Sequence, residues 1–153
     1  MYDQCIKLLK EHLLLSYEKD LIIDPNADAN NQEFMDGIQS LTKRVLFYNK
    51  NPGESDSVMP LDFLQLDFER FNKTFLSGLW FDAVHIISEP PPDQAAQFIK
   101  AACKFAESVS LIMPKDAVTA FPLSYQCLFS MNLPAACNKN KDLVFQTWLK
   151  ADY

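Results

Sequence analysis

The scarcity of glycine is the feature that most constrains how this chain can fold. Glycine occurs 3 times in 153 residues, against 9 prolines and 12 phenylalanines, whereas average usage would give roughly ten. Phosphate-binding loops, dinucleotide-binding turns and tight β-hairpins need glycines where φ is positive. We therefore expect none of these in its usual form, and we expect turns built from Pro, Asn and Asp.

Between these turns, apolar residues recur at helical spacing. In the first segment, for example, Ile6, Leu9 and Leu13 are three and four positions apart, which is typical of one face of a helix. Similar stripes predict about six helices, over roughly 3–21, 32–49, 60–78 with a short continuation to 88, 93–112, from 116 onward, and 141–151.

Strand patterns are weak by comparison. The runs 21–23 and 84–87 are the only β-like ones, and both are short. We therefore predict an all-α fold, with about six helices in antiparallel pairs that form a helical bundle or a small α-hairpin stack. We predict a single helical domain over 1–153, with an N-terminal helical hairpin at 1–50, a loop at 51–59 and a helical core at 60–153.

The acidic charge is concentrated in one region. The chain has a net charge of −6, which disfavours nucleic-acid binding because phosphate contacts need a basic surface. Residues 51–92 hold seven acids and two bases. This region is either an ordinary solvated face or a surface that attracts a basic partner. Its acids are Glu54, Asp56, Asp62, Asp67, Glu69, Asp82 and Glu89.

A second region, 117–138, has no charged residue at all. A helix that is apolar on most sides is normally buried, but a domain of this size has little room to bury one completely. Two explanations stay open: the segment is core, or part of it contacts another chain, either a second copy or a different protein. The candidate partner-binding residues are Phe121, Tyr125, Phe129, Met131 and Leu133.

Catalytic and metal-binding patterns are faint. His85 follows Asp82 by three residues, so on a helix the two would share a face and could serve a small hydrolase-like enzyme as a base and its orienting acid. The cysteines lack the paired spacing of a zinc site. The stretch 24–31 begins like a calcium loop, but it has Ala29 where such loops need glycine and Met35 where they need glutamate. We interpret it as a solvated turn.

These observations together favour a non-catalytic helical interaction module, namely an adaptor, assembly factor or small chaperone. It would dock a protein partner through the apolar helix surface, without cofactor or metal, and it would not be an enzyme. The alternatives are the small enzyme using His85 and Asp82, or a structural subunit of a larger assembly. The chain begins without a signal peptide, so we expect a cytoplasmic protein with no membrane association.

Overall fold

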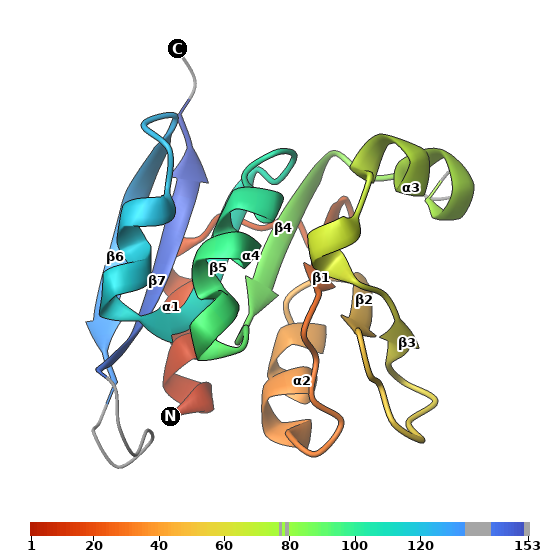
Figure 1. The fold of residues 1–153 in the computed structure, drawn as a ribbon, viewed down its shortest axis with the longest axis horizontal. Helices are drawn as coiled ribbons and strands as arrows, with labels where there is room; N and C mark the ends of the chain where they lie inside the picture. The colour runs from red at the N-terminus through yellow and green to blue at the C-terminus, as the bar shows by residue number, and fades with distance from the viewer. Residues whose placement is uncertain (77, 79, 134–141, 152–153) are drawn as a thin grey trace.

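A computed structural model describes residues 1–76, 78, 80–133 and 142–151. The chain forms a seven-stranded mixed sheet with helices on both faces, so the all-α prediction is wrong (Figure 1). The strands are Asp20–Asp24 (β1), Arg44–Asn49 (β2), Met59–Pro60 (β3), Ala83–Ser88 (β4), Ser108–Pro114 (β5), Tyr125–Asn132 (β6) and Leu143–Lys150 (β7). The α-helices are Tyr2–His12 (α1), Gln32–Gln39 (α2), Phe68–Phe75 (α3) and Ala95–Ala102 (α4). Short 3-10 helices are Phe63–Gln65 (η1), Pro92–Gln94 (η2) and Lys115–Ala120 (η3).

The strands lie in the order β3-β2-β1-β4-β5-β7-β6. The first five in this order pair in parallel, with Ile22 of β1 opposite Val45 of β2 on one side and His85 of β4 on the other. The last two are antiparallel: β7 pairs with β5, and β6 pairs with β7 at the edge. The sheet thus draws its strands from almost the whole length of the chain.

The two short β-like runs of the sequence are the central strands β1 and β4. Every residue of β1 is buried, and so is every residue of β4 after Ala83. A parallel strand that is covered on both faces is a continuous apolar run of a few residues, without the alternation that marks a half-exposed strand. Shortness was therefore the wrong reason to discount these runs.

The predicted helices of the C-terminal half are mostly strands. The helix expected over 93–112 ends at Ala102, and β5 begins at Ser108. The segment expected as a helix over 141–151 contains β7, in which Val144 and Trp148 both contact the same core cluster. Residues four apart share a face in a strand as well as in a helix, so this spacing did not distinguish the two. Pairing with β5 and β6, which are distant in the chain or on another strand, stabilises this segment as a strand.

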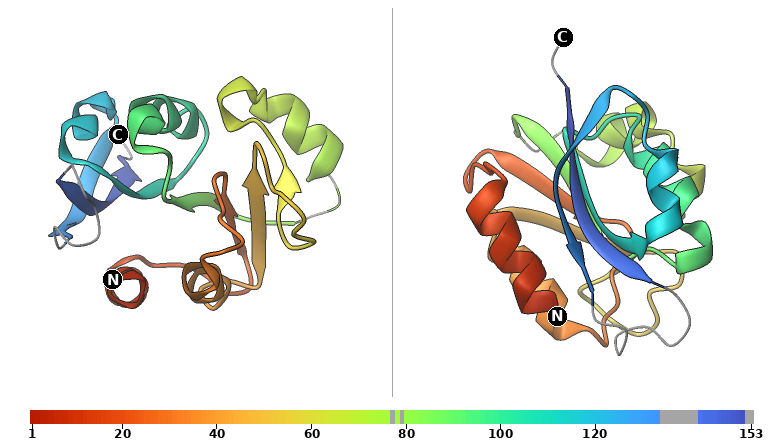
Figure 2. Two further views of the ribbon diagram at one scale, coloured as in Figure 1. Left: turned by 60° about the horizontal axis from the view of Figure 1, so that its bottom comes forward. Right: turned by 90° about the vertical axis from the view of Figure 1, so that its left-hand side faces the viewer.

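Helices cover both faces of the sheet (Figure 2), and an apolar cluster lies beneath them on each face. On one face, α1 and α2 pack over Ile22, Ile87 and Phe145. On the other face, α3, α4 and η1 pack over a second cluster that includes Ile86 and Leu111. On the first face α2 connects β1 to β2, on the other face α4 connects β4 to β5, and this arrangement creates the site described next.

Candidate functional site

The course of the chain reverses between β1 and β4, at the centre of the sheet (Figure 1). From β1 the chain continues to β2 and β3 on one side, and from β4 it continues to β5 on the other. The helix after β1 packs on one face and the helix after β4 packs on the other (Figure 2). Open α/β sheets bind ligands in the crevice that such a reversal leaves at the carboxyl ends of the strands.

Asp24, the last residue of β1, is a buried acid at this crevice. It is 1% exposed. Ser88 Oγ, at the end of β4, donates to Asp24 Oδ1 over 2.6 Å, and the backbone N–H of Asn26 donates to the same oxygen over 3.1 Å. Burial raises the pKa of Asp24 to about 7, although both hydrogen bonds lower it. A carboxyl group that titrates near neutral pH is typical of functional sites.

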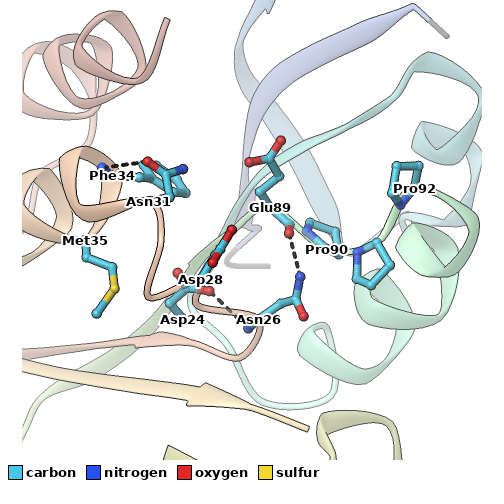
Figure 3. A pocket seen from close by; sticks show the side chains of 10 residues that line it. Asp24, Asn26, Asp28, Asn31, Phe34, Met35, Glu89, Pro90 and Pro92 are labelled. Carbon is cyan, nitrogen blue, oxygen red and sulfur yellow. Dashed lines mark hydrogen bonds between the residues drawn. The ribbon is translucent and has the colours of Figure 1, made fainter. Parts of the chain in front are cut away.

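Asn26 connects the ends of three strands. Its Nδ2 donates to the backbone oxygen of Glu89, just after β4, over 2.8 Å (Figure 3). From the end of β2, Asn49 Nδ2 donates to Asn26 Oδ1 over 3.4 Å and to the backbone oxygen of Ala27 over 2.9 Å. Side-chain hydrogen bonds therefore hold the turn after β1. In dinucleotide-binding folds, glycines at the same turn bring the backbone close to the ligand instead.

Two cavities lie on either side of this connection. The smaller, of about 250 Å³, lies at the ends of β1 and β4 (Figure 3) and is lined by Asp24, Asn26, Asp28, Asn31, Phe34, Met35, Glu89, Pro90, Pro91 and Pro92. The larger, of about 430 Å³, lies toward β2 and β3 and is lined by Pro25, Asn26, Asn49, Lys50, Asn51, Leu61, Asp62, Phe63, Leu64, Gln65, Pro91, Gln94 and Phe98. Only Asn26 and Pro91 belong to both. The larger cavity alone has the size of a small-molecule site.

The crevice is acidic. Four carboxyl groups line the two cavities, whereas Lys50 is the single basic residue among their lining residues. Lys50 Nζ is already 3.7 Å from Asp62 Oδ2. An acidic lining attracts cations and repels phosphates.

Within the described residues, only Gly53, in the loop between β2 and β3, has a positive φ. Pro25 follows Asp24 directly and has no N–H to donate. The turn between β1 and α2 therefore lacks the glycine-rich backbone that cradles phosphates in dinucleotide-binding folds. The expectation that no such turn could be built in its usual form agrees with this geometry, but it did not exclude the α/β fold itself.

Glu89 presents a carboxylate to the smaller cavity. The Tyr2 hydroxyl of α1 donates to Glu89 Oε1 over 2.6 Å. Burial raises the pKa of Tyr2, and the neighbouring Glu89 carboxylate raises it further. Tyr2 is therefore a protonated donor at neutral pH, and it orients Glu89 at the end of β4.

His85 lies in the central strand β4, outside the crevice, and its imidazole contacts residues other than Asp82. Asp82 precedes β4 and lines one cavity together with His85, but the two imidazole nitrogens contact other side chains. His85 Nε2 is 3.1 Å from Asp20 Oδ2, and His85 Nδ1 is 2.6 Å from Ser108 Oγ. Burial lowers the pKa of His85 against the opposing effect of Asp20, so we interpret this as a hydrogen-bonded neutral imidazole.

The Asp20–His85–Ser108 cluster has the hydrogen bonds of a catalytic triad, but its serine is not accessible to a substrate. Ser108 is 0% exposed. A cavity of about 520 Å³ is lined by Asp20 and His85, but Ser108 is not among its lining residues. A nucleophile must reach its substrate, and this one is covered. The cluster therefore stabilises the ends of β1, β4 and β5.

The five candidate partner-binding residues do not share a helix. They lie around η3 and β6, and they divide between the two faces of the sheet. Phe121 and Tyr125 pack with the α4 side, where Phe121 stacks on Trp148 with ring centroids 4.3 Å apart. Phe129, Met131 and Leu133 pack with the α1 side. The remainder of the uncharged segment, 134–138, lies outside the described residues.

The acids of 51–92 are likewise dispersed. Asp62 and Glu89 line the crevice, as described above. Asp67 caps α3 by accepting from the backbone N–H of Arg70, and the remaining acids lie on loops or in the first turn of α3. Of the predicted site residues, the fold thus brings only Asp62 and Glu89 to the crevice.

Sequence reasoning missed Asp24 and Asn26 as site residues. A signal was present, because Asp24 and Glu89 each stand at or just after the end of an apolar β-like run. Polar residues at the carboxyl ends of parallel strands gather at one edge of the sheet. The signal could be used only by treating those runs as strands.

Across the described residues, no group of three or more His, Cys, Asp or Glu side chains is placed to hold a metal ion. No helix in the same part of the chain is long and apolar enough to cross a membrane.

Comparison with known proteins identifies the fold. No protein-family model and no curated protein sequence matches the chain. Among solved structures, TrmN from Thermus thermophilus matches with a TM-score of 0.54 and 13% identity, over 98% of this chain and 48% of TrmN. The N-methyltransferase NodS from Bradyrhizobium japonicum WM9 matches with a TM-score of 0.58 and 10% identity, over 99% of this chain and 94% of NodS. This chain spans about half the length of TrmN.

At this identity the likeness establishes the fold alone. It overturns the prediction of a non-catalytic helical adaptor, assembly factor or chaperone, because that prediction rested on an all-α architecture. The prediction that the chain is not an enzyme rested on the faint catalytic patterns, and the fold shared with an N-methyltransferase contradicts it.

Proposed function

We propose that this protein is a methyltransferase that binds S-adenosylmethionine in the crevice at the carboxyl ends of β1, β2 and β4. The observation that carries the proposal is the pair of adjoining cavities at the point where the strand order reverses. The shared fold with an N-methyltransferase supports the reaction class.

The charge of the crevice selects among nucleoside cofactors. A dinucleotide brings a pyrophosphate, which needs backbone N–H groups and positive charge at the turn after β1. This turn offers Pro25 and the carboxylate of Asp28 instead. S-adenosylmethionine carries a sulfonium, an ammonium and one carboxylate, so it is a net cation and suits an acidic lining better than a pyrophosphate does. The donor set therefore fits the sulfonium cofactor and not a dinucleotide.

The larger cavity suits the nucleoside. Phe63, Leu64 and Phe98 give it an apolar wall for a base. Asp62 and Asn49 supply polar groups for hydroxyls on the same side. The smaller cavity, with Asp28 and Glu89, is left for the charged amino-acid end.

Glu89 is the group placed to handle a proton. When bound, S-adenosylmethionine supplies an electrophilic methyl group. If the acceptor is an amine, its nitrogen forms the new bond to carbon while the sulfur–carbon bond breaks, and one proton must leave the nitrogen. The Glu89 carboxylate, oriented by Tyr2, accepts this proton.

The test is a binding measurement followed by an activity measurement. Isothermal titration calorimetry with S-adenosylmethionine should show saturable binding below about 1 mM, and NAD should not bind at that concentration. Glu89→Gln should reduce methylation of small amines by roughly 100-fold or more even at saturating S-adenosylmethionine, and the loss of one lining charge should also weaken cofactor binding. Glu69→Gln, an exposed acid on α3 outside both cavities, is the matched control and should behave like the wild-type protein.

Two results would refute the proposal. One is a folded protein that takes up no S-adenosylmethionine; the other is equal binding of NAD, which would remove the charge argument.

We further propose a cytoplasmic location, which the free thiols of Cys5, Cys103 and Cys127 support.

A further inference from the structure

We propose that Asn26 is the specificity-determining residue of the crevice. Its side chain separates a nucleoside subsite in the larger cavity from an amino-acid subsite in the smaller one. A ligand that spans both subsites binds only after Asn26 gives up its hydrogen bond to Glu89. This inference rests on the proposed function.

The first observation is that the two cavities have a common wall. Asn26 and Pro91 are the only residues that line both cavities. Pro91 is backbone-restricted on the η2 side, whereas Asn26 is a side chain that can change rotamer. Of the two, Asn26 is therefore the part of the wall that can move.

The second observation is that the wall crosses the crevice. Asn26 Nδ2 donates to the backbone oxygen of Glu89 after β4 (Figure 3). Asn26 Oδ1 accepts from Asn49 at the end of β2. The Asn26 side chain thus runs from the β1 turn across the point where the strand order reverses. This is the path along which a nucleoside ligand with a charged tail would lie.

The third observation is chemical. In dinucleotide-binding turns a glycine lets the ligand approach the backbone closely. Here the turn carries Asn26, with a full amide side chain, after Pro25. The space that a glycine would leave open is filled by an amide, and the amide is fixed by partners on two other strands.

The prediction concerns a ratio of affinities. Adenosine fits the larger cavity alone, so its binding leaves the Asn26–Glu89 hydrogen bond intact. S-adenosylmethionine must break that bond, at the expense of roughly tenfold in affinity. Removing the amide should therefore strengthen S-adenosylmethionine binding about tenfold while changing adenosine binding by less than about threefold.

The experiment measures both dissociation constants by calorimetry for four proteins. These are the wild type, Asn26→Ala, Asn26→Ser as a second variant that retains a polar group, and Asn30→Ala as the control. Asn30 is an exposed residue of the same turn and lines neither cavity. Thermal melting verifies that each variant is folded. The expected result is a lower ratio of the S-adenosylmethionine constant to the adenosine constant in both Asn26 variants, with Asn30→Ala unchanged.

The possible failures are distinct. If adenosine binds and the ratio is unchanged or higher in the Asn26 variants, Asn26 is not a barrier, although the proposed function survives. If a folded wild-type protein binds neither ligand, and the Asn26 variants do not either, both proposals are overturned.

Discussion

Asp24→Asn should stabilise the protein at alkaline pH and remove part of its pH dependence. Asp24 is 1% exposed and lies between Ser88 and the Asn26 backbone. An asparagine of nearly the same shape can accept both hydrogen bonds through its side-chain oxygen, but it can never become charged. The substitution therefore isolates the ionisation of one buried carboxyl group.

The magnitude follows from the two pKa values. The ordinary value is 3.8 and burial raises the pKa of Asp24 to about 7. Between these values the unfolded chain has lost the proton and the folded chain still holds it, so stability falls as pH rises. The full difference corresponds to about 4 kcal/mol, of which about 3 kcal/mol falls between pH 5 and 8. The buried amide N–H groups of the variant offset part of this by about 1–3 kcal/mol at every pH.

Urea denaturation of both proteins at pH 5, 6, 7 and 8 provides the measurement. The free energy of unfolding of the variant, minus that of the wild type, should rise by about 3 kcal/mol across this range. Other titrating groups contribute equally to both proteins and cancel in the difference. A difference that stays flat would show that Asp24 is already ionised in the folded protein at pH 5, and the burial argument would be wrong.

Two further predictions concern stability. Burial lowers the pKa of His85 from 6.5, so the unfolded chain takes up a proton first as pH falls below 6.5, and the folded protein loses stability. His85→Gln should remove this loss when urea denaturation is compared at pH 5 and pH 7; parallel behaviour of the two proteins would contradict it. In α2, a Cβ on Gly37 would lie 2.5 Å from Ile6 Cγ1 of α1. Gly37→Ala should therefore destabilise the protein by about 1–2 kcal/mol, because overpacking outweighs the gain in helix propensity. Gly78→Ala, where a Cβ would meet nothing within 4 Å, is the control, and equal melting temperatures for the two variants would count against the close contact.

Part of the candidate site could be predicted from the sequence. The Pro, Asn and Asp residues after 21–23 and the prolines after 84–88 correctly predicted two turns. Asp24, Asn26 and Glu89 lie at or in these turns. Their meeting could not be predicted, because β1 and β4 are more than fifty residues apart in the chain. Only parallel pairing of those strands brings the two turns to one edge of the sheet.

The same limit explains His85. The sequence offered Asp82 as its partner because a spacing of three suits a helix. Asp82 instead precedes β4, and pairing of β4 with the neighbouring strands brings Asp20 and Ser108 to the imidazole. The wrong prediction of a helix at residues 84–88 thus led to the wrong hydrogen-bond partner for His85.

The sequence by itself determined the turns, the glycine-poor backbone, the acidic balance and the short helices α1, α2 and α3, because each depends on residues that are neighbours in the chain. The tertiary structure decided between helix and strand at 84–88, 108–114, 125–132 and 143–150. A spacing of four satisfies both conformations, and a buried strand has no period of its own. The choice was made by hydrogen bonds to partners far along the chain, and the same pairing created the acidic crevice that Asn26 divides.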